Sequence, residues 1–337
     1  MDGKKLLLDI QDLTIHYVTE GGTVHAVEHL NLSLAPGENL GFVGETGAGK
    51  TTTALGIMGL IPNPPGKVIS GKILFDGEDL LKKSGEEMRK IRGGKIAMIF
   101  QDPMTSLNPV ITVDKQIAEM VGLHQDVTEQ EALSKAEEML ELVGIKRERA
   151  KDYPHQFSGG MKQRVVIAIA LACNPILLIA DEPTTALDVT IQAQVLELMH
   201  ELRRKINTSL VMITHDLGIV AEMCDKVAIM YAGKVVEYAP TEALFRRPYH
   251  PYTEGLFNSI PDLDSEQEEL KVIQGLMPDP MNLPQGCTFH PRCPYAEEQC
   301  SREVPPMVEI EPGHFAACPV RGRAAERRSG TAGEGAK

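Results

Sequence analysis

The chain has 337 residues, 42% of them hydrophobic, which is enough for one large or two modest domains. A net charge of -13 provides no basic surface for a polyanionic backbone and argues against nucleic-acid binding. The most apolar stretch (165–180) is broken by Asn174-Pro175 and is too short to span a bilayer, and no apolar core of signal-peptide length follows Met1. We therefore expect a cytosolic protein whose six cysteines are thiols or metal ligands rather than disulfides.

The first hundred residues are predicted to be rich in β-structure. Alternating hydrophobicity predicts strands over 8–17 and 27–34, and an apolar run over 40–43 predicts a strand that enters a glycine-rich loop. Asp76-Gly77 indicates a turn between two further strands, and residues 96–100 are typical of a buried strand.

Helical patterns begin after Gln101. Thr128 and Glu131 have the spacing of a capping box, apolar residues recur at helical spacing over 133–143, and Gly144 can end this helix. Further along, helices are expected from Ser158, over 191–202 and over 217–223, and strands over 176–180, 210–214, 227–230 and 234–238. Helices that alternate with apolar strands predict a mostly parallel α/β sheet.

The amino-acid composition changes beyond Ala239. Prolines recur, an acidic run covers 262–269, and four cysteines lie between Cys287 and Cys318, which together indicate a separate small extension. Residues 321–337 are rich in Arg, Gly and Ala without apolar periodicity and are predicted to be disordered.

Residues 44–51, Gly-Glu-Thr-Gly-Ala-Gly-Lys-Thr, match the phosphate-loop pattern in its required context between a strand and a helix. The glycines let backbone N–H groups converge on phosphate oxygens, Lys50 adds a cation, and the Thr51 hydroxyl can ligate Mg²⁺. The residues expected to hold ATP here are Gly44, Glu45, Thr46, Gly47, Ala48, Gly49, Lys50, Thr51 and Thr52.

Two adjacent carboxylates, Asp181 and Glu182, end the apolar run 176–180. Alone, such a pair could be a solvated strand end or a helix cap. Beside a phosphate loop, Asp181 is expected to hold Mg²⁺ and Glu182 to polarise the water that attacks the γ-phosphate.

Ser158-Gly159-Gly160 precedes a helix and forms another nest of N–H groups with a hydroxyl, suited to a second phosphate surface. Alone, it could be a simple N-capped helix. With this motif between the loop and the carboxylates, the sequence resembles the ATP-binding-cassette (ABC) family over roughly residues 6–260.

The resemblance implies an α/β fold: a P-loop NTPase (RecA-like) core with an N-terminal antiparallel β subdomain, a helical subdomain and the small cysteine-containing C-terminal extension. The implied boundaries are a nucleotide-binding domain over 6–250, its helical subdomain over about 106–165, the extension over 251–320 and the tail over 321–337.

The resemblance also implies roles for four further residues. Tyr17 would stack on adenine, Gln101 would sense Mg²⁺ and the membrane subunit, Asp188 would belong to the D-loop, and His215 would be the switch histidine. Ordinary alternatives exist: Tyr17 as a core residue, Gln101 as an exposed amide and His215 as a strand-end polar residue.

By the same resemblance, ATP binds between two cassettes, so the implied partners include a second ATPase subunit, identical or homologous. The others are two integral-membrane permease subunits and, indirectly, an extracytoplasmic peptide-binding protein. The protein would then lie peripherally on the cytoplasmic face of the inner membrane.

Residues 104–109 and 247–253 resemble the oligopeptide, dipeptide and nickel importer ATPases, although a surface turn and a proline-rich linker are alternatives. Peptide uptake is therefore expected, with nickel chelate or oligosaccharide as alternative cargo. A DNA-repair or chromosome-organising ATPase would need a coiled-coil insertion or a basic face, and ribosome-acting cassettes typically carry two cassettes in one chain.

Four clustered thiols in a poorly cored segment suggest tetrahedral zinc or an iron–sulfur cubane held by Cys287, Cys293, Cys300 and Cys318. The lack of tight C-x-x-C pairs, and the resemblance to peptide importers in which a [4Fe–4S] cluster occurs, favour the cluster over Zn²⁺; uncoordinated thiols are a third alternative. His290 and His314 are alternative ligands but are expected to be surface residues or neighbours of the ligands, and Cys173 and Cys224 are expected to pack in the core.

Overall fold

The computed structural model describes residues 5–185, 187–259 and 272–321. The acidic run 262–269 and, apart from Arg321, the predicted disordered tail lie outside the described residues. The chain forms two compact units: the first contains chiefly residues 75–213, and the second combines 8–33, 40–74 and the chain from 214 onward.

Three parallel strands lie side by side in the first unit: β6 (Ile96–Ile99), β7 (Leu177–Asp181) and β8 (Ser209–Thr214). Leu177 is the register partner of both Ile96 and Ser209. Every residue of the three strands is buried, as expected when both faces of a parallel sheet are covered. The predicted strand 96–100 ends one residue early, and Phe100 is 41% exposed.

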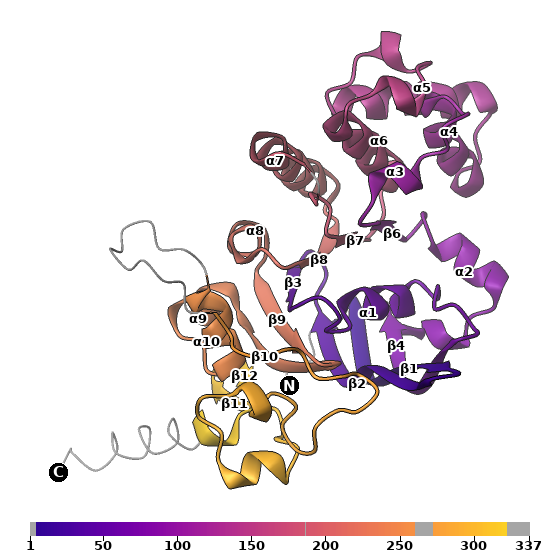
Figure 1. The fold of residues 1–337 in the computed structure, drawn as a ribbon. Coiled ribbons are helices and arrows are strands. Elements are labelled where there is room, and N and C mark those ends of the chain that lie inside the picture. The colour runs from indigo at the N-terminus through magenta and orange to yellow at the C-terminus, as the bar shows by residue number, and fades with distance from the viewer. Residues whose placement is uncertain (1–4, 186, 260–271, 322–337) are drawn as a thin grey trace. The chain divides into compact units, whose positions relative to one another are not determined.

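Four helices of the first unit form one cluster (Figure 1): α3 (Pro103–Ser106), α4 (Val113–His124), α5 (Glu129–Leu142) and α6 (Gly159–Leu171). The capping box of α5 is confirmed, because the Thr128 hydroxyl accepts from the Glu131 N–H and the Glu131 carboxylate accepts from the Thr128 N–H. Gly144, with φ of 78°, follows this helix as predicted. The unit also contains β5 (Glu78–Asp79), α2 (Gly85–Ile91) and α7 (Val189–Ile206).

The second unit contains two sets of strands. One is antiparallel, in the order β2 (Gly22–Leu34), β1 (Leu8–Thr19), β4 (Gly66–Phe75). The other has the order β11 (Val308–Glu311), β12 (His314–Ala316), β10 (Lys234–Pro240), β9 (Lys226–Tyr231), β3 (Asn39–Val43). β3 and β9 run parallel and the other neighbours run antiparallel, so the cysteine-containing segment adds two strands beside β10.

The helices of the second unit are α1 (Lys50–Ile57), α8 (Leu217–Met223), α9 (Thr241–Arg246) and α10 (Pro251–Asn258). Short 3₁₀ helices cover Leu80–Lys82, Arg147–Arg149, Pro154–Gln156, His290–Arg292 and Glu298–Ser301. In the part of the chain that is described, no helix has the length and apolar character needed to cross a membrane.

Candidate functional site

The predicted phosphate loop joins the buried strand β3 to helix α1, as the sequence indicates. Glycine is required at both of its ends. A Cβ on Gly44 would lie 2.2 Å from the carbonyl oxygen of Met230, and a Cβ on Gly49 would lie 2.2 Å from that of Ala26. Gly49 also has φ of 104°, which strains any other residue, so the backbone of the loop packs directly against neighbouring backbone.

Lys50 is buried and lies along the inside of this loop. Its Nζ donates to the carbonyl oxygens of Gly44 at 2.6 Å and Glu45 at 3.0 Å. The next residue, Thr51, is exposed. The hydroxyl of Thr52 lies 3.4 Å from that of Tyr17 on β1, so Tyr17 is located at the start of α1. This position suits contact with a nucleotide base, and the stacking role stays a prediction.

Glu45 of the loop forms an ion pair with Arg292, which the sequence did not predict. The Nη1 of Arg292 donates to both carboxylate oxygens of Glu45, at 3.2 and 3.1 Å, and to the hydroxyl of Tyr231 at 3.4 Å. The Glu45 N–H donates to the hydroxyl of Tyr252 at 2.9 Å. Burial would lower the pKa of Arg292, but the hydrogen bonds to Tyr231 and Glu45 raise it.

Arg292 itself is well enclosed, with 8% of its side chain exposed. The rings of Tyr231, Tyr252 and Phe289 pack within 5.4 Å of one another, centroid to centroid, and so position both hydroxyls around Arg292 and Glu45. Because 247 positions separate Arg292 from Glu45, no local pattern could have predicted the pair. The cysteine-containing segment thus contacts the phosphate loop directly.

The paired carboxylates lie at the end of β7. Asp181 is buried, and Glu182 adopts φ of 45° while its N–H donates to the carbonyl oxygen of Ile213. Oε2 of Glu182 accepts hydrogen bonds from the Gln101 side-chain amide at 2.9 Å and from the Thr185 hydroxyl at 3.0 Å. The structure therefore brings together two predicted site residues, Gln101 and Glu182, and adds Thr185.

Ser158 is the N-cap of α6, and its hydroxyl accepts from the Met161 N–H at 3.4 Å. A Cβ on Gly160 would lie 2.4 Å from Cγ2 of Ile191, which explains the second glycine by close packing. Ser158 and Gly159 are exposed, so this helix end can be reached by a ligand.

Asp188, also exposed, caps α7 by accepting from the Ile191 N–H at 3.0 Å. His215 follows β8 and is exposed, and the next residue, Asp216, caps α8. The phosphate loop, Tyr17 and His215 belong to the second unit, whereas the carboxylates, Gln101, Asp188 and the Ser158 motif belong to the first.

The four C-terminal cysteines line one small cavity, together with His250 and His290. The Cys287 N–H donates to the Cys300 carbonyl at 2.8 Å, so the two backbones are adjacent. Within the described ranges, no three of the four sulfurs lie within 4.8 Å of one another. Burial raises the pKa of Cys293 to about 11, and the nearby thiols add to this shift, so the thiol is protonated at neutral pH unless a cation is bound.

The two histidines that the sequence analysis placed beside the cysteines, His290 and His314, have defined partners. His290 donates from Nδ1 to the Cys287 carbonyl at 2.9 Å. His314 is fully buried rather than at the surface, and its Nε2 donates to Glu237 at 2.7 Å. Cys224 is buried as predicted, whereas Cys173 is half-buried and donates to the Met120 carbonyl.

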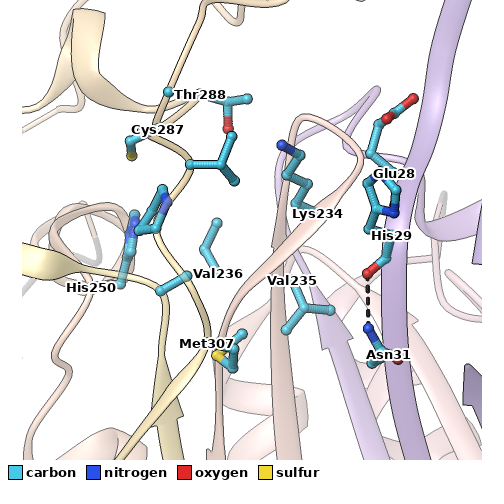
Figure 2. A pocket seen from close by; sticks show the side chains of 14 residues that line it. Glu28, His29, Asn31, Lys234, Val235, Val236, His250, Cys287, Thr288 and Met307 are labelled. Carbon is cyan, nitrogen blue, oxygen red and sulfur yellow. Dashed lines mark hydrogen bonds between the residues drawn. The ribbon is translucent and has the colours of Figure 1, made fainter. Parts of the chain in front are cut away.

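A separate cavity of about 300 Å³ lies between β2, β10 and the cysteine-containing segment (Figure 2). Glu28, His29 and Lys234 are its charged or titratable lining residues on the strands, and Cys287 and His250 lie on the opposite side. No residue of the phosphate loop contributes to its lining, so it is distinct from the predicted nucleotide site.

Two protein families match the chain. Residues 27–185 match the family described as ABC transporter, and residues 236–300 match the C-terminal region of the oligopeptide/dipeptide transporter family. The second match includes Cys287, Cys293 and Cys300.

Several characterised proteins are similar along almost their whole length. The oligopeptide transport ATP-binding protein OppD of Bacillus subtilis is 52% identical over 312 residues, 92% of this chain and 87% of that protein. OppD of Escherichia coli is 50% identical over 93% of this chain and 92% of its own. The dipeptide transport ATP-binding protein DppD of Bacillus subtilis is 49% identical over 95% of this chain and 96% of its own.

Solved structures agree with the predicted fold class. A dimeric ATP-binding cassette in a post-hydrolysis state, bound to ADP and Pi, has a TM-score of 0.63 and 27% identity over 69% of this chain and 98% of that chain. The cbiO1 protein of Clostridium perfringens, part of an ABC transporter complex, has a TM-score of 0.62 and 28% identity over 72% of this chain and 92% of its own.

Proposed function

Because this chain belongs to the ABC transporter family of ATP-binding subunits, we propose that it hydrolyses ATP to drive the import of dipeptides or oligopeptides. The main support is that the sequence similarity to OppD and DppD proteins covers both the nucleotide-binding residues and the cysteine-containing segment. The chain is an ATP hydrolase coupled to transport.

We assign the nucleotide residues the following roles. The N–H groups of the phosphate loop and Lys50 bind the β- and γ-phosphates, Tyr17 contacts adenine, and Thr51 with Asp181 holds Mg²⁺. Mg²⁺ would neutralise charge that develops on the transferred phosphoryl group. These roles rest on the loop geometry and on the buried position of Asp181 at the end of β7.

Glu182 is proposed as the base that orients the attacking water. The hydrogen bonds that its carboxylate accepts from Gln101 and Thr185 fix the orientation of Glu182. Through the hydrogen bond from Gln101, a change at the Mg²⁺ site or in the membrane subunit would alter the position of the Glu182 carboxylate. His215 is proposed to contact the γ-phosphate.

Ser158, Gly159 and Gly160 are proposed to bind ATP held by a second ATPase subunit, with Asp188 near the same contact. The exposed N-terminus of α6, a helix of 13 residues, supports this assignment because it directs N–H groups outward. The second subunit is this chain again or a homologue, and both would bind two permease subunits on the cytoplasmic face of the membrane.

The four cysteines are proposed to hold a [4Fe–4S] cluster. The four cysteines line one small cavity, and the lack of tight C-x-x-C pairs favours the cluster over tetrahedral zinc. A bound cluster would cross-link the segment, and the ATP reaction requires no electron transfer from it.

The function is tested by deleting the gene in the organism that carries it and measuring uptake of labelled dipeptides, tripeptides, nickel and an oligosaccharide. Peptide uptake should fall and recover with the wild-type gene but not with Glu182→Gln. If only nickel or oligosaccharide uptake is lost, that substrate is the cargo instead of peptides. Unchanged uptake of all four substrates would refute the transport function.

A further inference from the structure

Three potential metal ligands meet on the β1–β2 pair, and none of the three has a role in the nucleotide site proposed above. His16 lies on β1, and His25 and Glu28 lie on β2. Their ligand atoms all lie within 4.8 Å of one another, and all three residues are half-buried. The side chains of His16 and Glu28 are 16% and 14% exposed, and His25 is more accessible at 35%.

The two imidazoles share one carboxylate oxygen. Oε1 of Glu28 accepts from Nε2 of His16 at 2.5 Å and from Nδ1 of His25 at 2.8 Å, and the ring centroids are 4.4 Å apart. Burial would raise the pKa of Glu28, but the hydrogen bonds from His25 and His16 outweigh it and lower the pKa. The carboxylate is therefore ionised at neutral pH and has two imidazole nitrogens directed at it.

We propose that Nε2 of His16, Nδ1 of His25 and the Glu28 carboxylate form a binding site for a divalent transition-metal ion such as Zn²⁺. Two imidazoles and one carboxylate favour Zn²⁺ and its neighbours over Mg²⁺ and Ca²⁺, which prefer all-oxygen sites. The cation takes the place of the two hydrogen-bonding protons, and each ring then carries its proton on the other nitrogen. The site rests on this geometry and is independent of the proposed transport function.

Little rearrangement is needed. Zn–N and Zn–O bonds of about 2.1 Å in a tetrahedral site separate the ligands by about 3.4 Å, so the present contacts of 2.5 and 2.8 Å must open by less than about 1 Å. The exposed edge of His25 gives a cation access, and water can fill the fourth position.

The site would also stabilise strands next to the phosphate loop. Tyr17 follows His16 directly, and the carbonyl of Ala26 lies against Gly49. The Glu28 N–H donates to the Gly233 carbonyl, and the Gly233 N–H donates to the Ala48 carbonyl. A cation bound by residues of both strands would cross-link β1 and β2 beside this loop.

The test is a titration of the untagged, nucleotide-free protein with Co²⁺, read by difference absorption in the visible range. Wild-type protein should bind one Co²⁺ with weak d–d bands of nitrogen and oxygen ligation and without a thiolate charge-transfer band, which separates this site from the cysteines. Zn²⁺ should displace the signal. Loss of a ligand in His16→Gln or His25→Gln should weaken binding by more than about tenfold.

His29→Gln is the matched control, because His29 lies on β2 like His25 but pairs with Asp12 at an exposed position. It should bind Co²⁺ like the wild type. Equal Co²⁺ binding in all four proteins would overturn the site. So would a wild-type spectrum with only thiolate-ligated Co²⁺, a result that does not depend on whether the variants fold.

Discussion

Lys50 places its charge inside the phosphate loop, where its ammonium donates to the Gly44 and Glu45 carbonyls. Phosphate oxygens would replace these carbonyls as acceptors, and a hydrogen bond to a charged group contributes about 1.5–3 kcal/mol. Lys50→Ala should therefore weaken ATP binding roughly 10- to 100-fold, as measured by nucleotide titration. Lys72→Ala, an exposed lysine on β4 of the same unit, is the control, and equal affinity of both variants would contradict the assignment.

At the level of single residues, the sequence predicts a set of site residues but not how the fold holds them. The phosphate loop was predictable because each glycine and Lys50 occupies a fixed place in a contiguous pattern. The left-handed backbone of Glu182 and its bond to Gln101, 81 positions away, were not, because they depend on long-range packing.

At the scale of elements, the segment around Arg292 supports the phosphate loop. Arg292→Gln removes the ion pair with Glu45 and leaves that carboxylate beside the hydroxyls of Tyr231 and Tyr252. We expect several-fold weaker ATP binding with little change in turnover at saturating ATP, and partial recovery in Arg292→Lys. The measurement is a comparison of KM and kcat.

Arg302→Gln is its control, because Arg302 forms an exposed pair with Glu298 in the same segment. Should Arg292→Gln keep the affinity of Arg302→Gln, the contact with the loop would be structural packing only.

The cysteine segment is a second element with a testable role. Cys293→Ser should abolish the visible absorbance and the iron content of anaerobically purified protein, because one of four ligands is lost. ATP binding should persist, since the cavity that the four cysteines line includes no residue of the phosphate loop. Cys173→Ser should leave iron unchanged. Colourless wild-type protein with about one zinc would exclude the cluster and keep the four-cysteine site.

Elements were predictable where their signals are local. α5 begins at the capping box of Thr128 and Glu131, and the turn at Asp76-Gly77 has both residues at positive φ, as that pair favours. Strands β11 and β12 were missed, because runs of four and three residues have too little alternation to detect. β12 is stabilised by pairing with β10, and β11 by pairing with β12.

In the complete protein, the proposed hydrolysis requires two cassettes to share ATP. Ser158→Arg should leave ATP binding by the single chain intact, yet block ATP-dependent dimerisation and hydrolysis, because a bulky cation would occupy the exposed N-terminus of α6. Ser84→Arg is the matched control, since it also replaces an N-cap serine, on α2. Normal turnover of Ser158→Arg, or equal loss in both variants, would argue against a shared site.

Glu182→Gln tests whether Glu182 drives the hydrolysis of ATP held between two cassettes. Because the loop is unchanged, this variant should bind ATP normally while hydrolysis, measured with the partner subunits present, falls on the order of 10²–10⁴-fold. Size-exclusion chromatography with light scattering should then show a stable complex of two cassettes in Mg²⁺ and ATP, formed with a second copy or with the homologous subunit. Near-normal turnover, or an ATP-loaded variant that stays monomeric in both mixtures, would contradict the account.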